Sequence, residues 1–262
     1  MKIALIQLNI VFEVKQTNYE RTERFIQEAS QAACDIAVLP ELCVTGFSKN
    51  ISAFAEDGDG ETATILSNMA KTYHINLIAG CMEKAMGLEK AKNVAAVYNR
   101  EGTLVAKYTK IHPFSFTQED RYFIPGDQVV TFEVEGMPAG MFICYDLRFP
   151  EIFRSLVKDV KAIFVIANWP TSRKDHWETL LRARAIENQC FVIGVNRTGT
   201  DNHGLHFPGA SHIFDPFGKD LCAGNDSDEL LIAEFDPAEV ESVRAAFPFL
   251  QDMRPFKMVL RS

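Results

Sequence analysis

The stretch GMFICYDLRFPE, residues 140–151, joins a short apolar run to a polar segment at a single cysteine, Cys144. An apolar run that stops so abruptly is typical of a buried β-strand that ends at the rim of a sheet and passes into a helix. Cys144 would then lie at the carboxyl end of a strand, where open α/β sheets bind their ligands. A thiol nucleophile fits this place, although a free cysteine is more often a small buried hydrophobic residue.

Two other apolar runs also end beside an ionisable side chain. The run IAVLPEL, residues 36–42, delivers Glu41 just after a proline that cannot continue a strand ladder. The run LVAKYTKIHPF, residues 104–114, delivers Lys110. Taken singly, Glu41 fits a solvated loop carboxylate, and Lys110 fits a surface cation whose stem lies on apolar neighbours. Together with Cys144, they form a set of residues that can carry out nucleophilic catalysis.

These motifs resemble those of the nitrilase, or carbon–nitrogen hydrolase, superfamily. The resemblance is carried by PE at 40–41 with GF at 46–47, KYTKIH at 107–112, CYDLRFPE at 144–151, ANWP at 167–170, HW at 176–177, RARAIENQ at 182–189, NR at 196–197 and DPFG at 215–218. It covers essentially the whole chain. Within the superfamily the sequence is most similar to the ω-amidases, which implies hydrolysis of the terminal amide of 2-oxoglutaramate and 2-oxosuccinamate.

Alternating apolar runs and amphipathic segments predict an α/β protein built of helical layers and mixed sheet. Strands are expected at residues 1–9, 36–39, 75–82, 93–99, 103–108, 129–134, 139–143, 162–167, 190–195, 211–214 and 230–235, and helices at 61–73, 148–157, 175–188 and in a segment that begins near Thr17 and includes Ala33. The resemblance implies an α-β-β-α sandwich of two mixed sheets flanked by helices. We expect one domain over residues 1–262, with an apolar tail at 246–262 that packs on the body or on a partner subunit.

The proposed catalytic roles follow from thiol chemistry. A cysteine with a pKa of about 8.5 is mostly protonated at neutral pH and needs a base and a nearby cation. Glu41 fits the general base and Lys110 the cation, which can also donate to the oxyanion together with the backbone N–H of Tyr145. Glu119 falls where the family often has a further glutamate, so the resemblance implies a supporting catalytic role. The alternative interpretation is that Glu119 is an ordinary charged residue in a surface loop.

An acidic protein needs a local cation to bind an anionic substrate, and the planar fork of arginine suits a carboxylate. Arg173 follows an Asn-Trp-Pro segment that contains Trp169, and we expect both residues at the rim of the crevice. Arg148 is the other candidate, although it could instead pair with Glu151 or Glu187.

Composition excludes several classes of protein. The 47% hydrophobic and 24% charged content is that of an ordinary globular protein. A net charge of -8 and a pI near 5.3 argue against binding to nucleic acid or to an anionic membrane surface. No run of about eighteen apolar residues occurs that could form a transmembrane helix. The six cysteines show no C-x-x-C spacing, which favours reduced thiols and a cytoplasmic location.

The residues predict a cytoplasmic cysteine amidohydrolase that needs neither cofactor nor metal, and the resemblance implies that it is a homodimeric ω-amidase. It would convert a small oxo dicarboxylic monoamide to acid and ammonia through a thioester. One alternative is another small aliphatic amide or carbamoyl-amide hydrolase, and a nitrile hydrolase is a weaker one. A non-catalytic protein or a redox-sensing thiol protein on the same fold is the alternative from another class.

Overall fold

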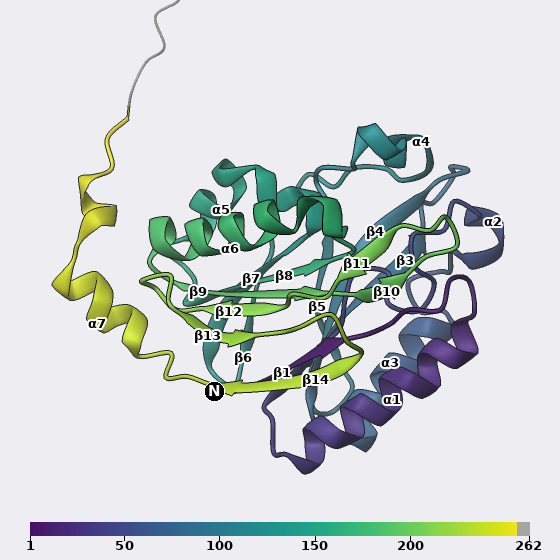
Figure 1. Cartoon of the computed structure of the whole chain (residues 1–262), viewed down its shortest axis with the longest axis horizontal. Coiled ribbons are helices and arrows are strands. Elements are labelled where there is room, and N and C mark those ends of the chain that lie inside the picture. Colours follow the sequence, from purple (N-terminus) through teal and green to yellow (C-terminus); the bar gives the residue numbers. More distant parts are fainter. Residues whose placement is uncertain (256–262) are drawn as a thin grey trace, which may run out of the picture.

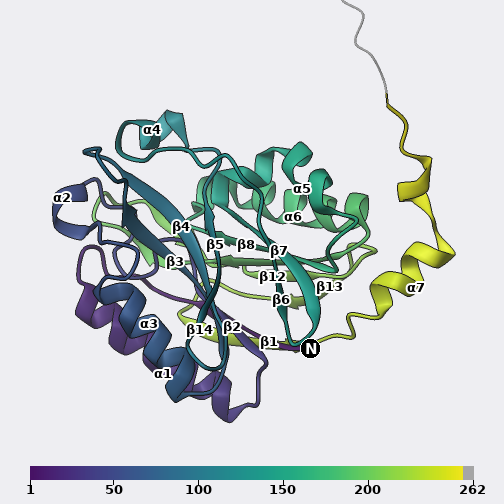
Figure 2. The same ribbon diagram turned by 180° about the vertical axis from the view of Figure 1, so that it is seen from behind.

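A computed structural model describes residues 1–255 of the chain. Two six-stranded sheets lie face to face, and helices cover the outer face of each (Figures 1 and 2). In strand order, the first sheet consists of β14 (Glu229–Glu234), β1 (Lys2–Gln7), β2 (Ile36–Val38), β3 (Asn76–Lys84), β4 (Ala91–Tyr98) and β5 (Leu104–Thr109). The second consists of β13 (Asp220–Ala223), β12 (His212–Phe214), β9 (Phe191–Asn196), β8 (Ala162–Ala167), β7 (Met137–Ile143) and β6 (Thr131–Val134).

The strand directions bring several strand ends to the same edge of the sandwich. Strands β1, β2 and β3 are parallel, as are β7, β8 and β9, whereas the outer strands of both sheets are antiparallel to their neighbours. Because β5 is antiparallel to β4, and β4 to β3, the carboxyl end of β5 lies at the same edge as that of β2. Glu41 and Lys110 follow these two ends.

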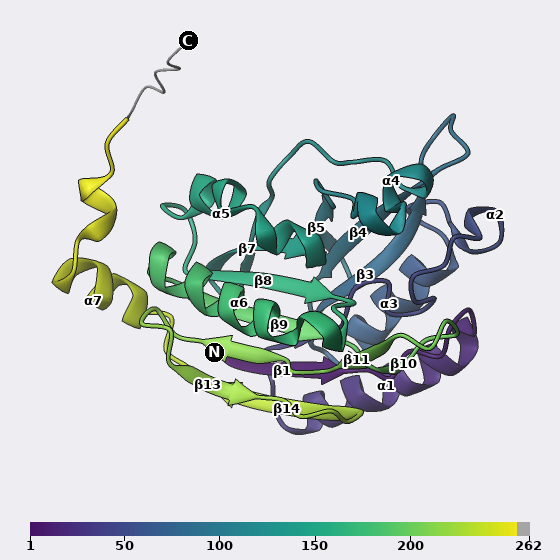
Figure 3. The same ribbon diagram turned by 45° about the horizontal axis from the view of Figure 1, so that its top comes forward.

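The helices form the outer layers, as predicted. Helices α1 (Lys15–Gln31) and α3 (Glu61–Thr72) cover the first sheet, and α5 (Pro150–Leu156) and α6 (Lys174–Asn188) cover the second (Figures 1 and 3). The main core fills the space between the two sheets, where it includes Leu5, Val38 and Phe164. It continues between the second sheet and its helices, where it includes Phe142 and Val165, and all five side chains are fully buried. Each such side chain stabilises the fold by about 1.5–3 kcal/mol, which explains why apolar runs dominate both sheets.

Local boundaries differ from the sequence prediction at the first helix. Helix α1 begins at Lys15, two residues before Thr17, and ends at Gln31. Ala33, which we expected on its buried face, lies beyond the helix with a left-handed φ of 55° and is exposed. The sequence also did not reveal β10 (Thr198–Thr200), β11 (His206–Pro208), β13 or α7 (Glu239–Ala246). Strands this short have no clear period of two.

The segment after α7 leaves one end of the sandwich (Figure 3). The Gln189 side chain donates a hydrogen bond of 2.7 Å to the carbonyl of Phe247, whose ring meets that of Phe217 edge-on at 5.7 Å. Phe249 and Met253 are 61% and 46% exposed. Residues 256–262 of the predicted tail lie outside the described residues, so its packing stays a prediction. Within residues 1–255, no helix is long and apolar enough to cross a membrane.

Candidate active site

Glu41 is held in the turn that follows β2. A close backbone approach makes this turn possible, because a Cβ at Gly80 on β3 would lie 2.5 Å from both the Pro40 carbonyl oxygen and the Leu42 nitrogen. Leu42 has a left-handed φ of 47°, an unfavourable conformation for a branched residue. The Glu41 side chain is 2% exposed. The turn therefore places a carboxylate between the sheets, where it is shielded from water.

Lys110 follows β5 and lies between two carboxylates. Its Nζ is 2.8 Å from Glu41 Oε1 and 3.0 and 2.9 Å from the two oxygens of Glu119. Glu119 begins the short helix α4 (Glu119–Tyr122) and also accepts the Phe114 backbone N–H at 2.7 Å. The side chains of Lys110 and Glu119 are 3% and 1% exposed. Charge pairs as deeply buried as this are stable only when they are well hydrogen-bonded, as these are.

Cys144 lies at the end of β7, where the chain enters a 3₁₀ turn, Cys144–Arg148. Its φ of 47° is left-handed, a strained conformation for a non-glycine residue that is characteristic of functional turns. The buried carboxylate of Asp146 holds this turn by accepting the Ile143 N–H at 3.1 Å and the Tyr108 hydroxyl at 2.7 Å. The turn carrying Cys144 is thereby tied to β5, the strand that leads to Lys110.

The charges in this cluster influence one another strongly. Burial alone would lower the pKa of Lys110, but the carboxylates of Glu119 and Glu41 outweigh it and hold the pKa well above its ordinary value. Burial, followed by the negative charge of Glu41, raises the pKa of Cys144 well above its ordinary value, despite the opposing effect of Lys110. At neutral pH Lys110 is therefore a cation, and the Cys144 thiol keeps its proton until a base removes it.

These side chains line an open cavity of about 490 Å³. Its wall includes Glu41, Lys110, Glu119, Cys144, Asn168 and Arg173, with Phe47, Phe114, Leu205 and Phe207 supplying apolar surface. A smaller lobe of about 270 Å³ shares Cys144, Asn168 and Arg173 and adds Tyr145, Arg148 and Trp169. All the residues singled out from the sequence thus line one of two connected lobes, with Cys144 common to both.

The two arginines lie at the smaller lobe without a carboxylate partner among residues 1–255. Arg173 lies over the Phe114 ring at 5.4 Å, and Arg148 lies over the Trp169 ring at 4.9 Å. Arg148 donates to His176 Nδ1 at 3.2 Å. The expected alternative, in which Arg148 pairs with Glu151 or Glu187, is wrong, because among the described residues Arg148 forms an ion pair with neither. The Glu187 carboxylate accepts from Arg184 instead, at 2.9 Å.

Two asparagines at the site escaped the sequence analysis. Asn93 Nδ2 donates to Glu41 Oε1 at 2.7 Å and to Glu119 Oε1 at 3.1 Å. The backbone N–H of Asn168 donates to Glu41 Oε2 at 2.8 Å, while its buried side-chain amide has no protein partner within the described part of the chain. For Asn168, its place directly after the apolar run 162–167 was an available signal, whereas nothing in the sequence distinguished Asn93.

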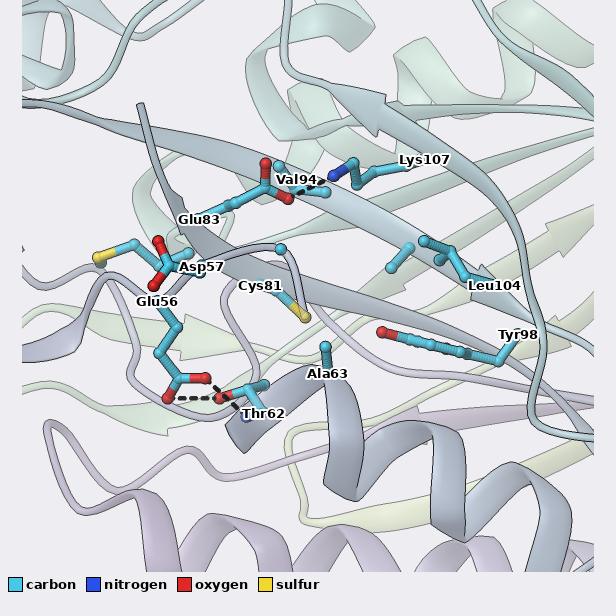
Figure 4. A pocket seen from close by; sticks show the side chains of 13 residues that line it. Glu56, Asp57, Thr62, Ala63, Cys81, Glu83, Val94, Tyr98, Leu104 and Lys107 are labelled. Carbon is cyan, nitrogen blue, oxygen red and sulfur yellow. Dashed lines mark hydrogen bonds and ion pairs between the residues drawn. The ribbon is translucent and has the colours of Figure 1, made fainter. Parts of the chain in front are cut away.

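A second cavity, of about 350 Å³, lies under α3 on the other face of the first sheet (Figure 4). It also contains a cysteine, a lysine and glutamates: Cys81, Lys107, Glu56 and Glu83. Its charged groups are already used within the protein, because Lys107 pairs with Glu83 at 2.7 Å and Glu56 accepts the Thr62 N–H at 2.6 Å. The lysine and the two glutamates of this cavity are therefore already paired with other groups of the described residues.

Solved structures share the whole architecture. The chain aligns with XC1258 from Xanthomonas campestris, a CN-hydrolase superfamily protein with an arsenic adduct in the active site, at a TM-score of 0.92 and 29% identity over 99% of both chains. It aligns with Nit3 from Saccharomyces cerevisiae, a member of the nitrilase superfamily, at a TM-score of 0.88 and 29% identity over 96% of both chains. These similarities define the class of fold as that of the nitrilase superfamily, as predicted.

The family follows from sequence comparison. The model of the carbon-nitrogen hydrolase family matches residues 2–245, and the chain belongs to this family. A 2-oxoglutaramate amidase from Bacillus subtilis (strain 168) is 35% identical over 254 residues, 96% of this chain and 97% of that protein. An omega-amidase from Homo sapiens is 32% identical over 264 residues, 97% of this chain and 95% of that protein. The predicted hydrolase class is thereby confirmed.

Proposed function

We propose that the chain is an ω-amidase that hydrolyses the terminal amide of a small oxo dicarboxylic monoamide, such as 2-oxoglutaramate, to the acid and ammonia. The observation that carries this proposal is a buried Lys110 that bridges Glu41 and Glu119 in the same cavity as the Cys144 thiol. The Arg173 guanidinium lines this cavity too and has no carboxylate partner among residues 1–255. The relatives named as 2-oxoglutaramate amidase and omega-amidase support the same substrate class.

In the acylation step, Glu41 removes the proton of the Cys144 thiol as the sulfur attacks the amide carbon. Because the pKa of Cys144 is raised, a base in the cavity is required, and such a base typically contributes 10²–10⁴ in rate. The new S–C bond converts the carbonyl into a tetrahedral oxyanion. The C–N bond then breaks as Glu41 returns the proton to nitrogen, so that ammonia leaves and a thioester remains on Cys144.

The oxyanion is stabilised by Lys110 and by the backbone N–H of Tyr145. Lys110 has three N–H donors, and the two oxygens of Glu119, at 3.0 and 2.9 Å, can share one of them. With a second directed to Glu41, the third is left for the substrate. A single donor of this kind typically contributes about 2.7–4 kcal/mol to transition-state stabilisation.

In the deacylation step, Glu41 takes a proton from water as the hydroxide adds to the thioester. The C–S bond then breaks, the carboxylic acid leaves, and the departing thiolate takes up the proton held by Glu41. One water is consumed and one ammonia released in each cycle, and the free thiol is regenerated. Glu119 remains bonded to Lys110 throughout and orients it.

The remote carboxylate of the substrate binds at the smaller lobe, where Arg148 and Arg173 line the wall beside Cys144 and Trp169. A guanidinium can bind a carboxylate through two parallel hydrogen bonds. We place Arg173 first because it lines both lobes. Arg173→Ala is expected to raise KM for 2-oxoglutaramate far more than for a neutral amide of similar length, and equal effects on the two substrates would contradict this assignment.

The deciding experiment is ammonia release from 2-oxoglutaramate, measured beside glutamine, asparagine and an aliphatic nitrile. We expect rapid release from the oxo acid amide, lost in Cys144→Ala. Equal turnover of a neutral amide would favour the other small-amide hydrolases, and turnover of the nitrile would favour a nitrile hydrolase. Redox sensing is disfavoured because sensor thiols have lowered pKa values, whereas the pKa of Cys144 is raised.

We also propose a homodimer, and a cytoplasmic location stays a prediction. Large apolar side chains gather on the surface near the end of α6: Ile186, Phe217 and Phe247 are 49%, 55% and 43% exposed. Contiguous exposed apolar residues usually mark an interface. Ile186→Glu combined with Phe217→Glu should yield a monomer by sedimentation analysis, and an unchanged mass would contradict the use of this surface.

A further inference from the structure

We propose that Asn93 is a positioning residue that directs the reaction to one oxygen of Glu41. The inference rests on the proposed role of Glu41 as the base and extends it to the atom. Asn93 is 1% exposed and does not line the cavity, so it acts through the two glutamates rather than on the substrate.

The position of Asn93 follows from strand pairing. The ladder between β4 and β5 pairs Val94 with Thr109, and the Lys110 N–H then donates to the Asn93 carbonyl at 2.9 Å. Asn93 and Lys110 are therefore cross-strand neighbours, whose Cβ atoms typically lie about 4.5–5.5 Å apart. Their side chains reach the same pair of carboxylates, one with an amide and the other with an ammonium.

The hydrogen bonds that each glutamate carboxylate accepts determine how many of its acceptor sites remain free. An ionised carboxylate offers about four acceptor sites, roughly two on each oxygen. Glu119 Oε1 accepts from Asn93 and Lys110, and Oε2 accepts from Lys110 and the Phe114 N–H, so Glu119 has no site left for a thiol proton.

Glu41 differs from Glu119 at one oxygen only. Its Oε1 accepts from Asn93 and Lys110, whereas among the described residues its Oε2 accepts only the Asn168 N–H. One acceptor site on Oε2 remains open for the Cys144 proton. Without Asn93, a site would open on Oε1 of both glutamates, and the proton could go to either.

The orientation of the Asn93 amide satisfies the two glutamates but leaves the amide oxygen without a hydrogen bond. Its Oδ1 is buried and has no hydrogen-bond partner within residues 1–255. A buried acceptor without a partner typically costs about 1–3 kcal/mol. The opposite orientation would direct Oδ1 at two carboxylates, which can only accept while they are ionised. The observed orientation therefore stabilises the two ionised carboxylates at the expense of one hydrogen bond of the amide, as expected of a residue whose role is to position them.

Two substitutions of similar size test the inference through the pH profile of amide hydrolysis. Asn93→Leu removes the donor, so the carboxylates hold protons more tightly, and the acidic limb of kcat/KM should move up by about one pH unit. Asn93→Asp supplies a donor only while the introduced carboxyl is protonated, so its activity should peak at lower pH than in the parent. In both variants kcat should fall about tenfold at neutral pH with KM unchanged.

Asn76→Leu is the matched control. Asn76 is also a buried asparagine of this sheet that donates to a glutamate, Glu135, at 2.8 Å, but it lies away from the cavity. The Asn76→Leu variant should be less stable than the parent but should keep the parental pH profile of amide hydrolysis. Profiles of both Asn93 variants that differ from the parent only in height would overturn the inference while leaving the amidase proposal intact. A parent chain that releases no ammonia from any amide would instead refute the proposed function.

Discussion

The two cavities on opposite faces of the first sheet contain the same kinds of side chain and differ in almost everything else. Each has a cysteine, a lysine and two glutamates in its wall: Cys144, Lys110, Glu41 and Glu119 in one, and Cys81, Lys107, Glu56 and Glu83 in the other (Figure 4). Lys107 and Lys110 even belong to one segment, three residues apart, and an odd separation along a strand puts side chains on opposite faces.

The side chains of the two cavities differ in how deeply they are buried. The side chains of Lys110 and Glu41 are 3% and 2% exposed, whereas those of Lys107 and Glu83 are 36% and 14% exposed. Charges interact far more strongly when water is excluded than at a surface. The lysine–glutamate pair of the first cavity is therefore expected to be much stronger than the one in the second.

Connectivity separates them further. Lys110 and Asn93 link both glutamates of the first cavity into one network. In the second cavity, Glu56 and Glu83 share no partner among the described residues, because Glu56 is bonded to Lys15 and Thr62, and Glu83 to Lys92 and Lys107. In Figure 4, Glu56 is bonded to Thr62, and Lys107 to Glu83. Cys81 sits within a strand, and its thiol meets the carbonyl of Ala79 at 3.8 Å. The two cavities therefore share their residue types but differ in how those residues are hydrogen-bonded to one another.

The largest expected contrast is between the two cysteines. Cys144→Ala removes the proposed nucleophile and should lower kcat for 2-oxoglutaramate by roughly 10⁴-fold or more. Cys81→Ala should leave kcat within about twofold, because its sulfur contacts no group of the proposed mechanism. Ammonia release under identical conditions measures both. A large loss in Cys81→Ala would mean that the second cavity takes part in the reaction.

The two lysines should differ in stability as well as in activity. Lys110→Met leaves two buried carboxylates without their cation, which typically costs about 3–5 kcal/mol, and it should lower kcat by about 10²–10³-fold. Lys107→Met breaks a partly exposed pair and should cost less than about 1 kcal/mol. Denaturant unfolding and turnover measure the two effects. Similar losses of stability in both variants would show that burial does not distinguish the pairs.

Two glycines offer a finer comparison. A Cβ at Gly80 would lie 2.5 Å from backbone atoms around Glu41, whereas one at Gly58 would lie 3.2 Å from the side-chain tips of Glu83 and Lys107. The backbone around Glu41 is less free to move than the flexible ends of the Glu83 and Lys107 side chains. Gly80→Ala should therefore displace Glu41 and lower kcat by about 10²-fold. Gly58→Ala should leave kcat unchanged. Turnover of both, with thermal melting as a check on folding, is the measurement.

The smallest expected effect is one that the two cavities share. Burial raises the pKa of both Cys144 and Cys81 well above the ordinary value of a thiol. A raised pKa in the folded state contributes stability that is complete below the unfolded pKa and is lost as pH rises towards the folded pKa. Above about pH 9, each thiol should therefore reduce the free energy of unfolding by about 1.4 kcal/mol per pH unit.

Either alanine variant should flatten this alkaline decline by the same amount. Chemical denaturation at a series of pH values between 8 and about 10.5, the ordinary pKa of lysine, measures it. If the alkaline decline in stability became flatter in Cys144→Ala alone, the Cys81 thiol would be accessible to water. The two cavities would then resemble each other only in their residue types.

The sequence by itself determined where the apolar strands stop and which ionisable residues follow them. Glu41, Lys110 and Cys144 were placed at strand ends because a buried strand must be apolar until it reaches the rim, and the structure brings these ends together. The layered fold followed for the same reason, since each amphipathic segment has one face to bury. The left-handed Ala33, by contrast, ended the first helix earlier than its apolar spacing indicated.

Only the tertiary structure decided which side chains share the cavity. The place of Asn93 depends on the register between β4 and β5, which shifts at an irregularity between Val97 and Tyr98. A slip of one residue sends every side chain of a strand to the opposite face, so the sequence could not assign Asn93 to the site. Arg148, likewise, meets His176 across a contact between helical elements, and contacts of this kind come from packing rather than from spacing along the chain.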